Sequence, residues 1–211
     1  MRHRKRGRKL GRGPSHQRAL LRNLASALFL TERDAEFDDN APKVKGRIIT
    51  TLAKAKEVRP LVERCITIAV KGLKAEQEAA QYATDAEHGS NEWKAWRESD
   101  RWQQWNAAIA PAVYARRRVL QLIGDKQAVR VLFDEVAERF EDRPGGYTRI
   151  VRLAKPRLGD AGERAILEFV GVRDRAHQRA EAPAFESDSG ESQQEPETVA
   201  AGEGAESGKA E

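Results

Sequence analysis

The sequence is poor in the residues that build disulfides and metal centres. Its 211 residues include a single cysteine, Cys65, and four histidines. One cysteine excludes an intramolecular disulfide and cannot form a zinc cluster by itself, so a reducing, cytoplasmic compartment fits the chain. Cys65 follows a helical pattern of apolar residues, which is typical of a small buried hydrophobe. No histidine has a partner at metal-ligand spacing, and we predict neither a metal nor a cofactor.

Membrane segments and nucleotide-binding motifs are also missing. No apolar run approaches the ~20 residues of a membrane span, and no apolar core follows the basic N-terminus as it would in a secretory signal. Neither a P-loop nor a Gly-x-Gly-x-x-Gly pattern occurs, and the carboxylates stand among Lys and Arg along helices, where surface pairing is their ordinary role. We therefore predict no membrane contact, no catalytic residue and no enzymatic activity.

Acidic residues are absent from the N-terminus, since the first one is Glu32. Residues 1–14 instead form a basic arm that has only Met1 and Leu10 to bury, so the arm cannot fold alone. A nucleic acid changes this balance, because each cation that neutralises a phosphate also releases condensed counterions. A localisation signal, a heparin-like patch and a solubilising tail have the same composition, but nucleic acid is the commonest partner and is favoured.

The C-terminal end has the opposite charge. From Ala180 onward the chain carries nine acids against Lys209 alone, a net charge of −8, so the total of +5 leaves +13 on residues 1–179. The segment is rich in Ala, Gly, Ser, Gln and Glu, and residues 174–211 are expected to form a disordered acidic tail. Competition with RNA for the basic surface stays open, although solvated filler is the favoured role of such a charge block.

The first third of the chain predicts a helix, a loop and a strand. A helical repeat of apolar residues follows the arm, with Ser15 as its predicted N-cap and with Arg18 and Arg22 off the apolar side. The polar segment 34–45 predicts a loop, and the short β-branched segment 46–51 predicts a strand.

A second helix is expected to begin at Leu52, with Thr51 as its cap. Its opening turns carry three cations, Lys54, Lys56 and Arg59. These cations oppose the helix macrodipole, and a phosphate bound at the same helix end would explain their presence. Solvated surface cations explain it equally well, and the residues alone do not separate the two readings.

All four tryptophans fall within residues 71–106, the least regular part of the pattern. They are Trp93, Trp96, Trp102 and Trp105. Their helical spacing fits either a base-stacking platform or the apolar edge of an amphipathic insert helix. Packing of the tryptophans onto the protein is favoured, because acids are interleaved with them and would repel phosphate.

The last third predicts two helices and a β-hairpin. Residues 111–123 read as a helix, and Asp125 is the expected cap of a helix that reaches Phe140. Residues 147–153 and 165–170 read as strands. The order of elements predicts an α+β fold, with helices in a layer over a small mixed sheet. The expected division is an arm at 1–14, a domain at 15–173 with inserts at about 34–45 and 71–106, and a tail at 174–211.

Several segments resemble one known family in a single order. They are the opening Met-Arg-His-Arg-Lys-Arg-Gly-Arg-Lys-Leu-Gly-Arg, Ser15-His16, Arg22-Asn23-Leu24-Ala25, Ile49-Thr-Thr-Leu-Ala-Lys-Ala-Lys-Glu-Val-Arg-Pro60, Val131-Leu-Phe-Asp-Glu135, Arg143-Pro-Gly-Gly-Tyr-Thr-Arg-Ile150 and Gly159-Asp160. The family is that of the bacterial large-subunit ribosomal protein numbered seventeen (bL17). The matches cover roughly residues 1–30, 46–70 and 113–172. Family members usually lack residues 34–45, the tryptophan-bearing stretch and the acidic tail.

The resemblance implies a structural, non-enzymatic protein that binds large-subunit ribosomal RNA near the peptide exit region and supports translation. Its expected partners are that RNA and neighbouring large-subunit proteins, with the chain a monomer within the cytoplasmic ribosome. A free-standing DNA- or RNA-binding regulator with the same arm is the alternative. The candidate RNA-binding residues are Arg2, His3, Arg4, Lys5, Arg6, Arg8, Lys9, Arg12, His16, Arg18, Arg22, Lys54, Lys56, Tyr147 and Arg149.

Overall fold

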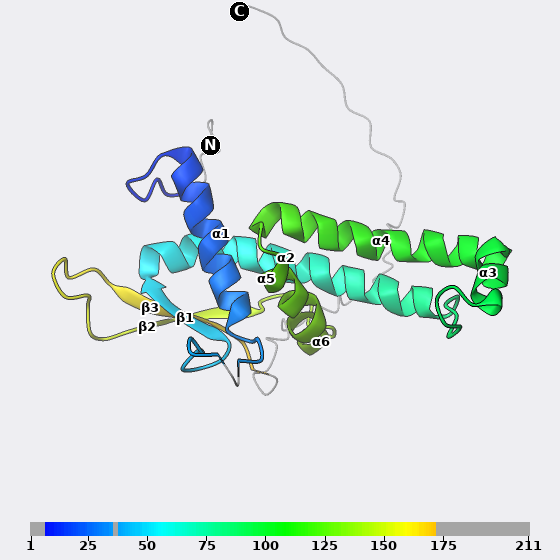
Figure 1. The fold of residues 1–211 in the computed structure, drawn as a ribbon. Coiled ribbons are helices and arrows are strands. Elements are labelled where there is room, and N and C mark those ends of the chain that lie inside the picture. Colours follow the sequence, from blue (N-terminus) through cyan, green and yellow to red (C-terminus); the bar gives the residue numbers. More distant parts are fainter. Residues whose placement is uncertain (1–6, 36–37, 172–211) are drawn as a thin grey trace, which may run out of the picture. The chain divides into compact units, whose positions relative to one another are not determined.

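The computed structural model of the chain describes residues 7–35 and 38–171 (Figure 1). The expected contacts Arg2, His3, Arg4, Lys5 and Arg6 and the expected tail lie outside these residues. The described elements are α1 (Pro14–Leu30), β1 (Arg47–Thr51), α2 (Leu52–Ala80), α3 (Asn91–Glu98), α4 (Asp100–Ile123), α5 (Lys126–Val131), the π-helical turn η1 (Leu132–Val136), α6 (Ala137–Arg139), β2 (Thr148–Arg152) and β3 (Arg164–Phe169). The fold is α+β, with helices packed over a small sheet, as the sequence predicted.

Within the described residues, three strands form a sheet in the order β1-β3-β2. Both pairings are antiparallel, so the sheet is not mixed as expected. The reason is that β3 lies in the centre, forming a hairpin with β2 on one side and pairing with β1 on the other. Ile48, Leu167 and Ile150 stand opposite one another across the three strands.

Alternation along the strands gives the sheet two different faces. Leu167 and Phe169 of β3 point into the core, beneath α2 and against Phe29 of α1. On the opposite face, Ile49 is 60% exposed and Val151 is 42% exposed. The helices therefore cover one face of the sheet.

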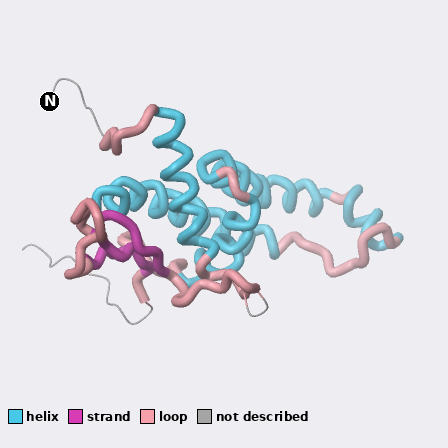
Figure 2. Tube along the Cα trace, turned by 60° about the vertical axis from the view of Figure 1, so that its left-hand side comes forward, coloured by secondary structure: helices cyan, strands magenta, loops and turns pink. Residues whose placement is uncertain are grey.

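Helices α2 and α4 lie side by side and extend away from the sheet, as Figure 2 shows from a second direction. Their backbones approach closely at Gly72, where an added Cβ would lie 2.9 Å from the Cβ of Ala115. The loop after α2 and the short helix α3 close the far end of this helical hairpin. None of the helices among the described residues combines the length and the apolarity that a membrane span requires.

The helix ends confirm two predicted cap positions and correct two other expectations. Thr51 is the N-cap residue of α2, without a hydrogen bond from its side chain. Asp125 caps α5 by accepting hydrogen bonds from the backbone N–H groups of Gln127 and Ala128. Ser15 is not a cap, because α1 begins one residue earlier at Pro14, whose fixed φ suits the first turn. Helix α4 begins at Asp100 and not at Pro111, which lies inside the helix.

The core forms where α1, α2, α4, α5 and η1 meet the inner face of the sheet. Its largest fully buried side chains are Phe29, Leu28, Ile66, Leu132, Leu167, Val58, Val62, Val119 and Val136. Cys65 lies among them, and burial raises the pKa of its thiol to about 12. This confirms the interpretation of Cys65 as a small buried hydrophobe.

Candidate nucleic-acid interface

The base of the arm is held against the start of α2. Arg8 Nε lies 3.5 Å from Glu57 Oε1, and the side-chain amide of Gln17 in α1 donates a hydrogen bond to the carbonyl oxygen of Arg8. The chain turns sharply here, because Gly7 and Gly11 have φ angles of +89° and +63°, which glycine adopts readily. The arm therefore leaves the fold beside the first turns of α2, and Arg8 and Lys9 are exposed there.

Helix α1 continues the positive charge of the arm. Arg12 Nη1 lies 2.9 Å from His16 Nε2, and His16, Arg18 and Arg22 are all exposed. Arg22 donates a hydrogen bond of 3.2 Å to the carbonyl oxygen of Gln121 in α4. Arg18 and Arg22 border a polar hollow of about 490 Å³ between α1 and the C-terminal end of α4. The structure thus places Arg18 and Arg22 together on one side of α1, and Arg12 beside His16 at the start of the helix.

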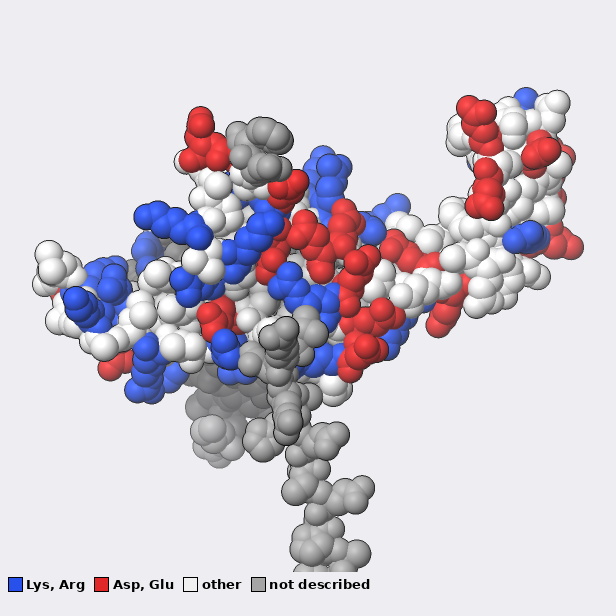
Figure 3. Space-filling model, turned by 90° about the horizontal axis from the view of Figure 1, so that it is seen from below, with Lys and Arg blue, Asp and Glu red and all other residues white. Residues whose placement is uncertain are grey.

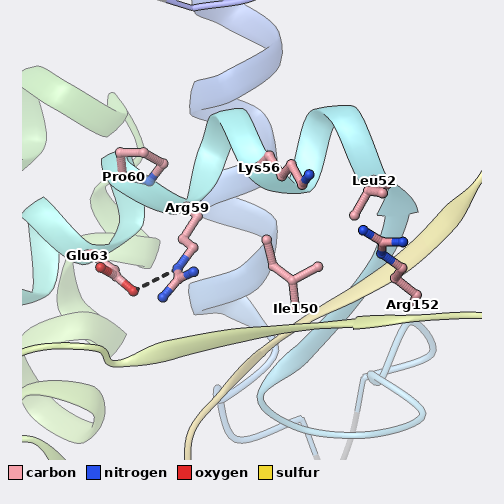
Figure 4. Close-up of a pocket in the computed structure, with 7 residues that line it drawn as sticks. All are labelled: Leu52, Lys56, Arg59, Pro60, Glu63, Ile150 and Arg152. Atoms are coloured by element: carbon pink, nitrogen blue, oxygen red, sulfur yellow. Dashed lines mark hydrogen bonds and ion pairs between the residues drawn. The ribbon is translucent and has the colours of Figure 1, made fainter.

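Three cations border a larger hollow between α2 and β2 (Figure 4). Lys56 and Arg59 come from α2, and Arg152 comes from β2. The volume is about 540 Å³, and we call this cavity the basic hollow. Its full lining is Leu52, Lys56, Arg59, Pro60, Glu63, Ile150 and Arg152. Three cations against one carboxylate leave a net charge of +2 on its walls.

Glu63 fixes the position of Arg59 at one end of the basic hollow. Its Oε1 atom accepts a hydrogen bond of 3.1 Å from Arg59 Nε and one of 2.9 Å from the hydroxyl of Thr148 in β2. Figure 4 shows the Arg59 guanidinium lying between the helix and the strand, beside Ile150. The carboxylate therefore ties the cation to the sheet and leaves the rest of the guanidinium facing the cavity.

Lys56 joins the basic hollow to the base of the arm. It also lines a neighbouring hollow of about 260 Å³, together with Arg8, Thr51 and Gly162. Glu163 also lines this smaller hollow, but the cations of the two hollows outnumber the acids, so residues that are far apart in the sequence form one region of net positive charge between Arg8 and β2.

The sequence missed two members of this region. Arg59 was noted on the helix but was not among the candidate contacts, and Arg152 was not considered. Arg59 follows Lys56 by three residues, which places both on neighbouring positions of one helix face. Arg152 lies two residues after Ile150, so strand alternation places both on the face that α2 covers. Both positions follow from spacings that the sequence contains.

The other second-tier candidates have different settings. Lys54 is partly exposed on the first turn of α2, outside the lining of both hollows. Arg149 lies on the opposite face of the sheet and pairs with Glu168 of β3. Tyr147 is 4% exposed and its ring packs 5.2 Å from that of Phe140. The aromatic ring of Tyr147 therefore packs in the core, and a role of this residue in RNA binding stays a prediction.

The loop between β2 and β3 projects from the same end of the fold. Leu158 at its tip is 100% exposed, and Arg157 forms an ion pair with Asp160. The hydrogen bonds from Arg157 hold the pKa of the Asp160 carboxyl well below its usual range. The ion pair thus orders the turn at the tip of the loop, which displays the apolar side chain of Leu158.

Charge is unevenly distributed over the described surface. Figure 3 shows Lys and Arg gathered over the sheet end of the fold, whereas Asp and Glu are prominent over the middle and at the projecting end of the helical hairpin. On this face, such an asymmetry favours attraction of a polyanion toward the sheet end. Across the described residues there is no group of three or more His, Cys, Asp or Glu side chains that could hold a metal ion.

Comparison with known proteins identifies the family behind this basic surface. The family model of ribosomal protein L17 matches residues 20–170. The chain is 67% identical to the large ribosomal subunit protein bL17 of Rhodopirellula baltica, over 95% of each chain. It is 35% identical to the bL17 protein of Nitratidesulfovibrio vulgaris, over 87% of this chain and 98% of that one.

The chain belongs to the ribosomal protein L17 family. This membership confirms the resemblance noted in the sequence and assigns the chain a structural role in the large ribosomal subunit. The bL17 protein of Agrobacterium fabrum, 34% identical over 89% of this chain and 99% of that one, is consistent with the same assignment.

Proposed function

We propose that the chain binds large-subunit ribosomal RNA through the basic arm, the exposed face of α1 and the basic hollow. The observation that carries this proposal is the place of Lys56, which lines both the basic hollow and the smaller hollow beside Arg8. The arm and the basic hollow meet at Lys56. A single RNA strand can therefore contact both of them. Phosphate contacts of this kind fix position and orientation, as a structural component of a ribonucleoprotein requires.

The hollows suit folded RNA because their cations are held apart by the fold. Arg59 is tied to Glu63, and Arg22 is tied to the carbonyl oxygen of Gln121. Side chains that are already ordered lose less conformational entropy when they engage a phosphate. Arm residues 2–6 supply further phosphate contacts, together with Arg8, Lys9 and Arg12.

The proposed setting is the bacterial ribosome, with one copy of the chain in each large subunit, beside neighbouring ribosomal proteins. No catalysis and no cofactor form part of this role. A free-standing regulator would use the same arm, but the relatives compared above are named as proteins of the large ribosomal subunit, which favours the ribosomal role. Sedimentation on a sucrose gradient distinguishes the two, because a ribosomal constituent travels with the large subunit.

The decisive measurement is the salt dependence of binding to a large-subunit ribosomal RNA transcript. Deletion of residues 2–12 removes roughly five to seven phosphate contacts and should shallow the slope of log K against log salt by about four to six units. The double variant Lys56→Gln/Arg59→Gln should shallow it by about one to two units. Both variants should retain the helical circular dichroism of the wild type.

The matched control is Lys126→Gln/Arg130→Gln, which removes the same charge from exposed positions of α5 outside both hollows. It should change the slope by less than the hollow variant does. Equal slopes for the wild type and the arm deletion would refute the arm's role. If the two double variants changed the slope equally, the cations of the basic hollow would contribute no more than other surface charges do.

A further inference from the structure

The far end of the helical hairpin holds a second hollow, lined by all four tryptophans. It has a volume of about 480 Å³ and lies between the loop after α2, α3 and the start of α4. Its lining is Ala83, Thr84, Ala86, His88, Trp93, Trp96, Arg97, Trp102 and Trp105. We call it the tryptophan hollow. Each of its tryptophans is half-buried, so their mutual packing leaves aromatic surface open to solvent.

Local contacts hold these rings in place. The indole N–H of Trp96 donates a hydrogen bond of 3.1 Å to the carbonyl oxygen of Tyr82, and the ring of Trp96 meets that of Trp105 edge to face with their centroids 5.6 Å apart. Arg101 donates hydrogen bonds of 3.1 Å to the carbonyl oxygens of Gln81 and Ala83. The hollow is therefore a preformed surface and not a chance grouping of mobile side chains.

One cation already occupies part of this surface. The guanidinium carbon of Arg97 lies 5.1 Å from the centroid of Trp93 and 5.8 Å from that of Trp102. These distances are those of cation–π attraction, in which a positive group sits over the electron-rich face of an indole. The indole rings of the hollow thus already bind one guanidinium group, that of Arg97.

The charge around the tryptophan hollow is also selective. Residues 81–106 carry five acids against three bases, a net charge of −2, whereas residues 1–179 as a whole carry +13. The acids are Asp85, Glu87, Glu92, Glu98 and Asp100, and all five are exposed. The projecting end accordingly displays red groups in Figure 3. This rim repels phosphate and attracts cations, unlike the basic hollow at the sheet end.

We propose that the tryptophan hollow docks a basic polypeptide segment of a partner protein, with Arg or Lys side chains against the indole faces and the rim acids. Tryptophan is among the side chains that contribute most to protein–protein contacts, and an open aromatic surface on a projecting element is typical of such a site. The proposal goes beyond RNA binding and stands independently of it, because it concerns the opposite end of the hairpin and the opposite charge.

Intrinsic tryptophan fluorescence of the full chain tests the proposal directly, since all four tryptophans line this hollow. The probe is a synthetic peptide that repeats Gly-Arg-Leu-Arg, and its counterpart has Gln in place of Arg. The Arg peptide should quench or shift the emission saturably, and the Gln peptide should not. Trp102→Leu should weaken binding by about tenfold, as expected from the loss of one cation–π face.

Rim charge provides the second arm of the test and does not depend on replacing a packed ring. Glu92→Gln/Glu98→Gln should weaken binding of the Arg peptide by at least about threefold. The matched control Glu138→Gln/Asp142→Asn removes the same charge from exposed positions outside the tryptophan hollow and should change the affinity by less than about twofold.

Three outcomes would overturn the proposal. The first is the absence of a saturable signal with the Arg peptide, and the second is an equal loss of affinity in the rim variant and its control. The third is tighter quenching by an oligouridine than by the Arg peptide, which would assign the tryptophans to base stacking. If thermal unfolding shows that Trp102→Leu is misfolded, the comparison of the rim variant with its control decides alone.

Discussion

Glu63 illustrates how a single acidic residue serves a basic surface. By itself, a carboxylate in a cationic hollow weakens attraction for phosphate. Here it accepts hydrogen bonds from both Arg59 and Thr148, so it orders a cation of α2 against a strand of the sheet. The net charge of the hollow stays positive because Lys56 and Arg152 add two further cations to its lining. Glu63 thus positions Arg59 and at the same time lowers the net positive charge of the hollow by one.

Cys65 provides a residue-scale test of burial. Because desolvation raises the pKa of its thiol to about 12, almost no thiolate is present in the folded protein at about pH 8. Alkylation by iodoacetamide should therefore be at least about a hundredfold slower in the folded chain than in the urea-unfolded chain, as followed by mass spectrometry. Because the pKa is raised in the folded state, the contribution of the Cys65 thiol to the free energy of unfolding is complete below pH 9.0, the ordinary pKa of a thiol. That contribution declines as the pH rises toward 12. Rapid labelling of the folded chain would contradict this.

Gly46 lies at a second constrained position, just before β1. Its φ angle is +72°, and an added Cβ would lie 2.7 Å from Glu32 Oε1. Glu32 forms hydrogen bonds of 2.8 and 2.9 Å with Arg139, so its carboxylate is not at liberty to move. Gly46→Ala should lower the free energy of unfolding by about 1–3 kcal/mol, measured by urea titration.

The control for Gly46 is Gly159→Ala. Gly159 has a φ of +97° but no atom within 4 Å of an added Cβ, so it carries the backbone strain without the clash. The loss at Gly46 should exceed the loss at Gly159. Equal losses of unfolding free energy in the two variants would show that Glu32 and Arg139 move aside without destabilising the fold.

At the scale of elements, the sequence predicted most helices and strands from periodicity but misjudged their ends. The strands were predicted to within a residue or two, because alternation and bounding glycines are local signals. Asp125 was predicted correctly as a cap, since its side chain needs only the next backbone N–H groups. The start of α4 was missed because Pro111 looks like a helix start in sequence, although packing against α2 carries the helix through it.

The crossing of α2 and α4 depends on the absence of a side chain at Gly72. An added Cβ there would lie 2.9 Å from the Cβ of Ala115 and 3.0 Å from the ring of Phe133. Alanine favours a helix by about 1 kcal/mol over glycine, but the overlap should outweigh this gain. Gly72→Ala should therefore lower the melting temperature, with a net loss of about 1–2 kcal/mol.

A second substitution identifies the cause of that loss. Ala115→Gly removes the nearer of the two clashing groups, so the double variant Gly72→Ala/Ala115→Gly should recover part of the stability lost in the single variant. Each variant is compared by calorimetry at the same protein concentration. Stability that is unchanged or raised by Gly72→Ala alone would show that the helices separate readily at this point.

At the scale of the whole molecule, the sequence predicted the family better than the surface. The exposed cations Arg8, Lys9, Arg18 and Arg22 were predicted from charge and helical spacing, because both are local features of the sequence. The basic hollow was not, since it forms only when β2 is brought beneath α2 by its pairing with β3. The burial of Tyr147 against Phe140 was not predicted for the same reason, because it depends on tertiary packing.

Net charge gives the last prediction. Truncation after Arg179 removes a segment of charge −8 and leaves +13 on the rest of the chain. That segment has only Phe185 and Val199 as large apolar side chains, so its removal should cost the fold little. When full-length and truncated chains are co-expressed with distinct tags, both should be recovered in large subunits from a sucrose gradient in nearly equal proportion. Exclusion of the truncated chain from large subunits would show that residues 180–211 act in docking. If the truncated chain instead gained only unspecific RNA binding at low salt, residues 180–211 would act as an electrostatic competitor of RNA.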